Sequence, residues 1–468
     1  MFTLLPYSAV GNRRPVCVCH PRRVAASSGI DRIGPGDLTE LVSDVGRAPL
    51  NVGAAIFFAD ENLRDPTTLM AVLTERLVGI RRLRQCLIEP ALGLGRPYWI
   101  DDDHFDVDAH FSQVHCPAPG DRDAALTLAV DAVIRPLSRS RPLWRAVLVT
   151  DIADPNGHTA LVMVLHHVLA DGIGGLAILA HLVDGVDSSP PLREQRRSGQ
   201  PSARELLYDN VIGRLHMLRR APRAIARLPT AWAELGRGAG GRAPRCSLNA
   251  PTGVRRAVGT VEVKLDTVRR AGRRWDATVD DVLLVAVGGA LGTILHRRGE
   301  FPPELVISVP ISARTADTSG QLGNRVGVMP VRVPLDGTPG DRLVAVSRAT
   351  RLQKANVRGL SAELLGPVFR ALAAAGMFRR FVDRQRRVNS FLSDLPGPPS
   401  TITVAGAPVT SIVPLIVSTG NVAVAFAALS YAGTLTVVVV VDPDVAPEVR
   451  EVAEAVREQF RSIVASAQ

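Results

Sequence analysis

Hydrophobic residues recur along the first part of the chain with the spacing of strands and helices in alternation. Asn51 to Phe58 is an apolar run of strand length, and Pro66 to Gly79 has the apolar spacing of a helix. The alternation continues with a helix over Asp121 to Ile134 and a continuous apolar strand over Ala160 to Leu165, followed by a further helix. This pattern predicts an α/β unit over residues 30–186.

A second α/β unit is predicted over residues 247–468, because strand and helix patterns alternate again there. The expected strands are Ala257 to Leu265, Leu305 to Ile311, Asn324 to Val333, Val422 to Leu429 and Leu435 to Val441. The expected helices are Val282 to Leu295, Asp341 to Val357, Ser361 to Gln385 and Val445 to Ala465. The longest near-apolar run, Val282 to Leu295, is 14 residues long, which is below the ~18 residues that a membrane span needs.

One stretch of the second unit contains no charged residue. It runs from Leu395 to Val441, and proline and glycine interrupt it repeatedly. The two apolar strands within it are expected to be buried on both faces. Such strands form either the core of a sheet or the wall of an acyl-chain tunnel, and their composition fits both interpretations equally.

The two units are joined by a basic segment, residues 187–246, which we interpret as a crossover linker. From Pro190 to Arg256 there are 14 arginines and four acidic residues. Leucines interleave with the arginines over Ala203 to Leu235, as in an amphipathic helix. Such a helix either lies on an anionic lipid surface or packs on its own protein with its arginines in water. Residues 1–29 are expected to be a flexible leader.

Composition excludes several classes of protein. The 468 residues are 46% hydrophobic and 21% charged, which is enough apolar material for a large core and excludes a disordered chain. The net charge is +10, but aromatic residues make up only 4%, which argues against base stacking on nucleic acid. The five cysteines imply no disulfide framework, and Cys17, Cys19 and His20 lack a second ligand pair for zinc.

The strongest chemical signal is the segment His166-His167-Val-Leu-Ala-Asp171-Gly172, an HHxxxDG pattern at the turn from a buried strand into a helix. A neutral imidazole held there can take a proton from a hydroxyl group near neutral pH. Asp171 can hold the geometry of the turn, and Gly172 is expected to let the backbone turn tightly. The alternatives are two satisfied core histidines or a pair of metal ligands. The chain has neither a G-x-S-x-G elbow nor a glycine-rich phosphate loop.

HHxxxDG is the signature of the CoA-dependent acyltransferase superfamily, and nearly the whole chain resembles one branch of it, the bacterial wax ester synthase/diacylglycerol acyltransferases. The resemblance departs from the family pattern at Ser138, Asp280 and Asp394, where the family usually has Asp, Asn and Asn. It rests on these segments: Gly95 to Asp106, Pro136 to Trp144, Leu248 to Arg256, Ala277 to Leu284, Val309 to Arg314, Gly323 to Val326 and Leu395 to Pro398.

The resemblance implies an α/β fold of two subdomains, like those of chloramphenicol acetyltransferase, with a tunnel between them. It implies acyl transfer from acyl-CoA to diacylglycerol, and to long-chain alcohols to give wax esters, with no metal or redox cofactor. His167 is the implied general base, and His166, Asp171 and Gly172 shape its loop. The implied substrate-binding residues are Pro142, Leu143, Trp144, Asp280, Asp281, Asn324 and Arg325.

Two other functions remain open at this point. One is a condensation-like acyltransferase that takes its acyl group from a carrier protein, and the other is a lipid-binding paralogue without turnover. In each case the expected location is the cytoplasm, with peripheral attachment to the inner face of the membrane or to lipid droplets and no nucleic-acid partner.

Overall fold

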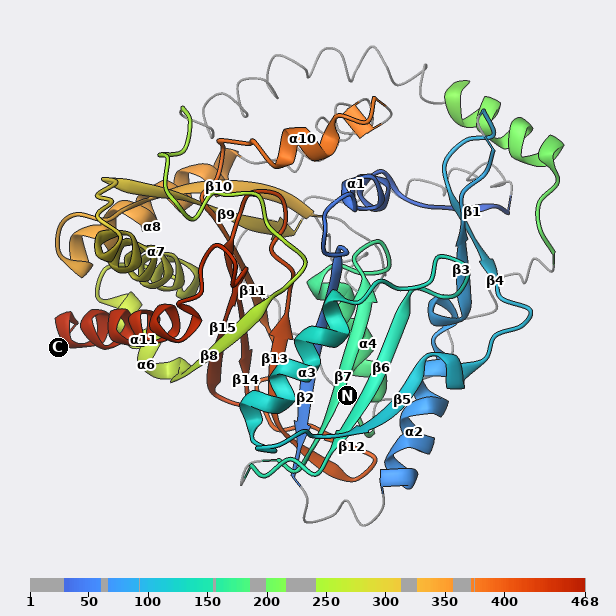
Figure 1. Ribbon diagram of the computed structural model, residues 1–468, viewed down its shortest axis with the longest axis horizontal. Helices are drawn as coiled ribbons and strands as arrows, with labels where there is room; N and C mark the ends of the chain where they lie inside the picture. Colours follow the sequence, from blue (N-terminus) through green and yellow to red (C-terminus); the bar gives the residue numbers. More distant parts are fainter. Residues whose placement is uncertain are drawn as a thin grey trace, which may run out of the picture.

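Two six-stranded sheets and one three-stranded sheet organise the described part of the chain (Figure 1). The computed structural model describes residues 29–59, 66–91, 93–154, 157–185, 199–215, 241–312, 326–356, 372–373 and 375–467. The expected leader, Cys17, Cys19, His20, Asn324, Arg325 and most of the linker lie outside these residues.

The N-terminal sheet has the strand order β12-β13-β2-β7-β6-β5. Its strands are β2 (Asn51–Phe58), β5 (Phe111–His115), β6 (Trp144–Thr150), β7 (Thr159–His166), β12 (Thr403–Val404) and β13 (Ala407–Leu415). The helices of this half are α1 (Pro35–Ser43), α2 (Pro66–Gly79), α3 (Arg122–Ile134) and α4 (Gly172–Leu182). A small sheet flanks it, with β1 (Asp31–Arg32), β4 (Tyr98–Asp101) and β3 (Gln85–Ile88), beside the 3-10 turns η2 (Arg81–Arg84) and η3 (Val107–Ala109).

The C-terminal sheet has the order β10-β9-β11-β14-β15-β8. Its strands are β8 (Ala257–Lys264), β9 (Glu304–Ser312), β10 (Val326–Pro334), β11 (Ser390–Pro396), β14 (Val424–Tyr431) and β15 (Thr434–Val441). Its helices are α6 (Leu265–Arg273), α7 (Val279–Arg297), α8 (Pro339–Asn356), α10 (Phe378–Val382) and α11 (Val449–Ser466). The single helix predicted over Ser361 to Gln385 is wrong in its described part, because a turn with Gly376 at a φ of 66° interrupts it and α10 then runs only from Phe378 to Val382. Residues 361–371 lie outside the described residues.

The described part of the linker is helical over residues 203–215. One face of this helix is anchored to the N-terminal half, because Arg32 donates to Asp209 over 2.5 Å and Asn210 donates to the carbonyl oxygen of Gly93 over 2.8 Å. Leu206 is buried on the same side. The helix therefore does pack on its own protein, as one of the two linker interpretations expects.

Strands β14 and β15 are buried on both faces, as the charge-free sequence predicts. Alternate side chains of β15 point to opposite faces. Val437, Val439 and Val441 pack with the core that contains α7 and α11, whereas Val438 and Val440 pack with the core that contains α3 of the other half. The described packing of these strands is that of a sheet core shared by the two halves.

Strand β13 crosses from the second half of the chain into the first sheet. It pairs antiparallel with β2, from Val409 opposite Phe58 to Leu415 opposite Gly53. The expected division at residue 247 therefore does not separate the sheets, since residues 403–415 belong to the N-terminal sheet. This exchange and the shared core fix the two halves against each other.

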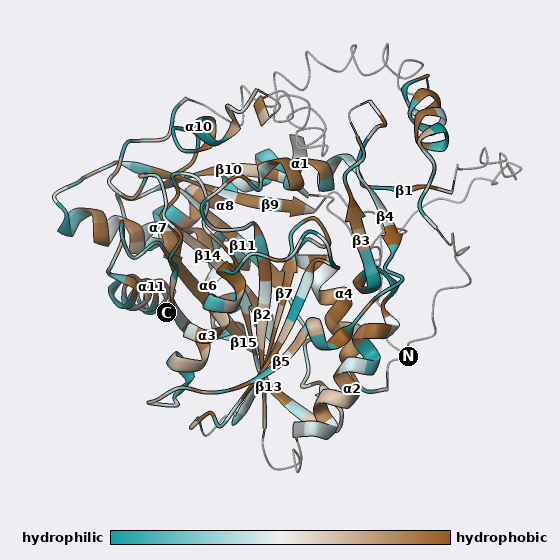
Figure 2. Cartoon of the chain, turned by 45° about the vertical axis from the view of Figure 1, so that its right-hand side comes forward, coloured by the Kyte–Doolittle hydropathy of each residue, from teal (hydrophilic) through white to brown (hydrophobic). Residues whose placement is uncertain are grey.

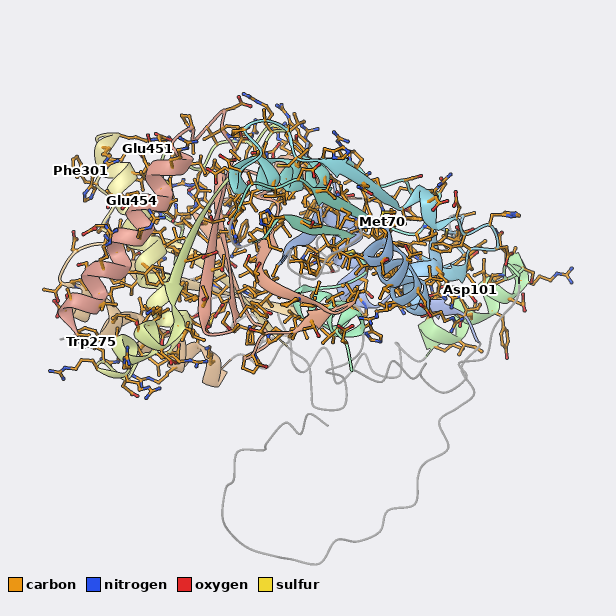
Figure 3. All side chains as sticks on the ribbon, turned by 90° about the horizontal axis from the view of Figure 1, so that it is seen from below. Met70, Asp101, Trp275, Phe301, Glu451 and Glu454 are labelled. Atoms are coloured by element: carbon orange, nitrogen blue, oxygen red, sulfur yellow. The ribbon has the colours of Figure 1, made fainter. Side chains whose placement is uncertain are left out.

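The hydropathy of helices α7 and α11 explains why one is buried in the C-terminal half and the other lies at its surface. Helix α7 is long and apolar enough to cross a membrane by length and composition alone, but 78% of its apolar window is buried inside the protein. Helix α11 is amphipathic, with hydrophilic and hydrophobic residues in alternation along it (Figure 2). Val452 and Val456 are buried, while Glu451 and Glu454 lie on its outer face (Figure 3). Helix α7 is thus the central helix of the C-terminal half, and α11 covers it.

Candidate active site

The histidine pair stands where β7 ends and the chain turns toward α4. All eight residues of β7 are buried, and His166, its last residue, lies opposite Asn51 of β2. The backbone N–H of His166 donates to the carbonyl oxygen of Leu143, and that of His167 donates to the carbonyl oxygen of Leu50. The turn is therefore held by two neighbouring segments before any side chain contributes.

The His166 side chain is fully engaged inside the protein. Its Nδ1 accepts a hydrogen bond from the backbone N–H of Val168 over 3.0 Å, and its Nε2 lies 3.1 Å from Oδ2 of Asp44. Because Nδ1 accepts, the ring proton is on Nε2 and is donated to Asp44. His166 is only 2% exposed. These contacts fit a residue that positions the loop and leave its ring no nitrogen for a substrate.

Asp44, which the sequence did not single out, holds His166 from the turn after α1. Its Oδ1 accepts from the backbone N–H of Leu50 over 2.8 Å, and its Oδ2 accepts from Arg139 over 2.5 Å. Burial raises the pKa of Asp44, but the hydrogen bonds from His166 and Leu50 and the charge of Arg139 outweigh it, so the pKa is below its ordinary value. Asp44 is therefore a carboxylate at neutral pH.

His167 has a different environment from its neighbour. Its side chain is 25% exposed, and its Nδ1 lies 3.9 Å from Oε2 of Glu40 on α1. Glu40 is thus the carboxylate that faces the His167 ring from α1. The sequence did not single out Glu40 either. Of the two histidines, His167 is the one that a substrate hydroxyl group can approach.

Asp171 and Gly172 have different structural parts at the start of α4. Asp171 is buried and is the N-cap of α4, where its Oδ1 accepts from the backbone N–H of Gly174 over 2.9 Å. The φ of Gly172 does not lie in the left-handed region, so the backbone conformation alone does not require a glycine there. A Cβ at Gly172 would instead lie 2.7 Å from both methyl groups of Leu395 on β11. Gly172 therefore permits a close approach between the two halves.

Pro142, Leu143 and Trp144 lie in the core behind the histidines. All three are buried. The Trp144 indole donates to the carbonyl oxygen of Leu83 over 2.7 Å and stacks on His110 with ring centroids 4.7 Å apart. Leu143 contributes the carbonyl oxygen that binds the His166 backbone. Their described contacts support β7 and its terminal turn, and their expected part in substrate binding stays a prediction.

Asp280 and Asp281 stand together at the start of α7 but have separate contacts. Asp281 is buried and forms a capping box with Thr278, while its Oδ1 accepts from Thr350 of α8 over 2.7 Å. Asp280 accepts from Lys354 over 3.0 Å. Asp281 thus fixes the helix terminus, and Asp280 is the more exposed of the two.

Asp280 also lies beside Asp394 of β11, the residue before Leu395. Burial, a hydrogen bond with Asp280 and the charge of Asp280 raise the pKa of Asp394 to about 8. At neutral pH the Asp394 carboxyl group therefore keeps its proton. This pair connects the start of α7 to the strand that packs on Gly172.

Among the described residues, no three His, Cys, Asp or Glu side chains come together in a way that could hold a metal ion. Residues 33–283 match the catalytic domain of the wax ester synthase/diacylglycerol acyltransferases, and residues 322–464 match the C-terminal domain of the same enzymes. The chain belongs to the wax ester synthase/diacylglycerol acyltransferase family.

Relatives in this family match over most of their length. A protein of Mycobacterium tuberculosis (strain H37Rv), named as a probable diacylglycerol O-acyltransferase, is 29% identical over 415 residues, which cover 86% of this chain and 88% of the relative. The wax ester synthase/diacylglycerol acyltransferase of Marinobacter aquaeolei VT8 has a similar fold, with a TM-score of 0.66, 19% identity and coverage of 93% and 99%. A starter condensation domain of rhizomide synthetase, solved with C8-CoA, has a TM-score of 0.61, 14% identity and coverage of 94% and 95%.

Proposed function

We propose that this member of the wax ester synthase/diacylglycerol acyltransferase family transfers a long-chain acyl group from acyl-CoA to the hydroxyl group of diacylglycerol, and to long-chain alcohols as a second acceptor class. The observation that carries the proposal is that the two histidine side chains have different environments. His166 is engaged at both ring nitrogens, whereas His167 is partly exposed beside Glu40. The names of the relatives supply the acceptor class.

In the proposed reaction His167 is the general base. Its imidazole takes the proton from the acceptor hydroxyl group while the hydroxyl oxygen attacks the thioester carbon. The tetrahedral intermediate collapses, the C–S bond breaks, and the imidazolium returns the proton to the leaving CoA thiolate. The products are an ester and free CoA. Glu40 stabilises the imidazolium between the two proton transfers, and the Asp44–His166 contact keeps the turn in place.

The tunnel between the halves is part of this proposal. The contact between Gly172 and Leu395 supports it, because the catalytic turn stands at the junction of the two halves. A site enclosed there would bring both substrates together and limit hydrolysis of the thioester.

The proposed location is the cytoplasmic face of a membrane or a lipid droplet, where diacylglycerol is dissolved. Support comes from the helix over residues 203–215, whose outward face carries Leu207, Tyr208, Val211 and Leu215, each about half exposed or more. Leu207, Val211 and Leu215 follow at intervals of four residues and form one stripe. Arg204 and Arg214 are exposed on the same helix. An apolar stripe with flanking arginines fits an anionic lipid surface.

The function is tested with purified protein and radiolabelled palmitoyl-CoA, offered diacylglycerol or hexadecanol, with the lipid products separated by chromatography. Labelled triacylglycerol or wax ester, formed together with an equal amount of free CoA, is the expected result. Palmitoyl groups transferred only from a carrier protein would favour the condensation-like alternative. Binding of palmitoyl-CoA without any ester product would favour a lipid-binding paralogue.

A further inference from the structure

Arginines gather just before the N-terminal end of β11, where two distant segments of the chain meet. A pocket of about 540 Å³ lies between residues 241–242 and 381–387. We call it the arginine pocket, because four of the residues that line it are Arg242, Arg384, Arg386 and Arg387. All of its lining residues belong to the described part of the chain, and none of them is acidic. Its volume falls in the range of small-molecule sites.

The backbone around the arginine pocket is firmly held. The N–H of Ala243 donates to the carbonyl oxygen of Arg386 over 2.9 Å, which joins the two segments. The Gln385 side chain accepts from the backbone N–H of Arg387 over 2.7 Å and donates to Asn421 over 2.7 Å. The arginines therefore project from a scaffold that is formed before any ligand arrives.

The positively charged arginines in and beside the pocket repel one another. Burial, followed by the charges of Arg245 and Arg242, lowers the pKa of Arg386. The Nε of Arg386 is buried and has no hydrogen-bond partner within the part of the chain that the structure describes. A buried donor without a partner costs free energy, and so does a group of like charges. An anion bound among these side chains would remove both costs.

We propose that the arginine pocket binds the phosphate groups of the acyl donor, the 3′-phospho-ADP end of acyl-CoA. Arginine pairs with phosphate through two parallel hydrogen bonds, which makes it the preferred residue for phosphate recognition. This inference rests on the proposed function, which supplies acyl-CoA as the substrate. The inference adds to the proposed function a binding site for the phosphate groups of that substrate.

The position of the pocket fits a donor that is long and has its phosphates far from its thioester. Strand β11 begins three residues after Arg387 and carries Leu395, which packs on Gly172 of the catalytic turn. Eight residues of extended chain from Arg387 to Leu395 span at most about 26 Å. In Figures 1 and 2, α10 and α1, which carries Glu40, lie along the same edge of the molecule. The pantetheine arm of CoA is the part that would bridge this interval.

The test compares donors with and without phosphates in variants of the pocket. The double variant Arg242→Gln/Arg387→Gln changes two exposed side chains and should fold normally, and Arg386→Gln is the second variant. Each should weaken the binding of CoA and of adenosine 3′,5′-bisphosphate at least tenfold by calorimetry. The KM for palmitoyl-CoA should rise by a similar factor, while kcat/KM for palmitoyl-pantetheine, which lacks the nucleotide, stays unchanged. Arg450→Gln on α11 removes the same charge elsewhere and should have no effect on either donor.

Unchanged affinity for CoA in both pocket variants would overturn the proposal. Unchanged CoA affinity together with loss of binding to phosphatidylglycerol vesicles would overturn it as well, and would assign the arginines to lipid headgroups. The calorimetric measurement does not depend on turnover. A wild-type protein that binds CoA through these arginines but forms no ester would therefore contradict the proposed function and leave the phosphate site supported.

Discussion

Two adjacent histidines at the end of β7 have opposite environments, and the reason is geometric. His166 is the last residue of β7 and turns inward to Asp44, whereas His167 is the first residue of the turn that follows and faces Glu40. The inward residue becomes part of a hydrogen-bonded network that reaches Arg139, while the outward residue keeps part of its surface in solvent. Two residues that are adjacent in the chain thus have different parts: His166 positions the turn, and His167 is the proposed base.

Asp44→Asn tests the network behind the histidines. The variant keeps the shape of the side chain but removes the charge that His166 and Arg139 share, which should cost about 1–3 kcal/mol of unfolding free energy at pH 7. Because the pKa of Asp44 is lowered in the folded protein, its stabilisation is present above the unfolded value of 3.8 and is lost as the pH falls below it. Denaturant unfolding at pH 7 and at pH 3.5 should therefore show a difference between variant and wild type that shrinks in acid. An equal difference at both pH values would contradict the assigned charge.

At the scale of elements, the turn that carries the histidine pair depends on how closely α4 and β11 approach. Gly172→Ala would place a methyl group against Leu395, and relieving that clash should cost about 1–3 kcal/mol and reduce kcat. Gly175→Ala is the matched control on the same helix, because nothing lies within 4 Å of its added Cβ. That change should be neutral or stabilise by up to about 1 kcal/mol. The measurement is the melting temperature and kcat of both variants. Equal losses in the two variants would argue against the contact between Gly172 and Leu395.

The carboxyl pair between α7 and β11 predicts a pH effect. The pKa of Asp394 is about 8 in the folded protein and 3.8 in the unfolded chain, so the folded state holds an extra proton between these values. The stabilisation from this proton is therefore full below about pH 4 and is lost as the pH rises toward 8. Asp394→Asn should melt at a higher temperature than wild type at pH 8, with the advantage falling as the pH is lowered to 5. Parallel pH profiles of the two proteins would contradict this, and Asp280→Asn should remove part of the same slope.

Local pattern was sufficient to predict the elements that have a periodic or continuous apolar signal. The bounds of β2 and α2 agree exactly, and α3 begins one residue after the predicted start because Asp121 is its N-cap. Helix α1 was not predicted, although Leu38 and Leu41 have helical spacing and pack against the N-terminal core. It is only nine residues long and has no fully buried residue, so its apolar signal is short. Because α1 was not predicted, Glu40 on this helix and Asp44 in the turn after it were missed as well.

Over the whole molecule, the contacts that complete the site join positions far apart in the sequence. His166 and Asp44 are separated by 122 positions, and β13 pairs with β2 more than 350 positions away. No local pattern specifies such pairings, because their stability comes from burial of shared surface rather than from propensity. The motif indicated the candidate site, whereas the residues that support it and the crossover of β13 required the fold.

The helix over residues 203–215 leads to a prediction about the whole molecule and its surroundings. The protein should float with phosphatidylglycerol liposomes and remain behind with phosphatidylcholine liposomes, and high salt should weaken the association because it screens the arginines. Leu207→Gln/Val211→Gln removes apolar surface that is about half exposed and should reduce flotation without lowering the melting temperature. Binding that ignores both salt and this substitution would speak against the helix as the attachment site.

The central claim is that His167 is the general base, and the rate of ester formation by His167→Ala tests it most directly. The account predicts a fall in kcat by a factor of about 10² to 10⁴ with palmitoyl-CoA and diacylglycerol, at an unchanged melting temperature. His181→Ala, on the exposed side of α4, is the matched control and should retain the wild-type rate. A His167→Ala protein that melts normally and makes ester as fast as wild type would contradict the account.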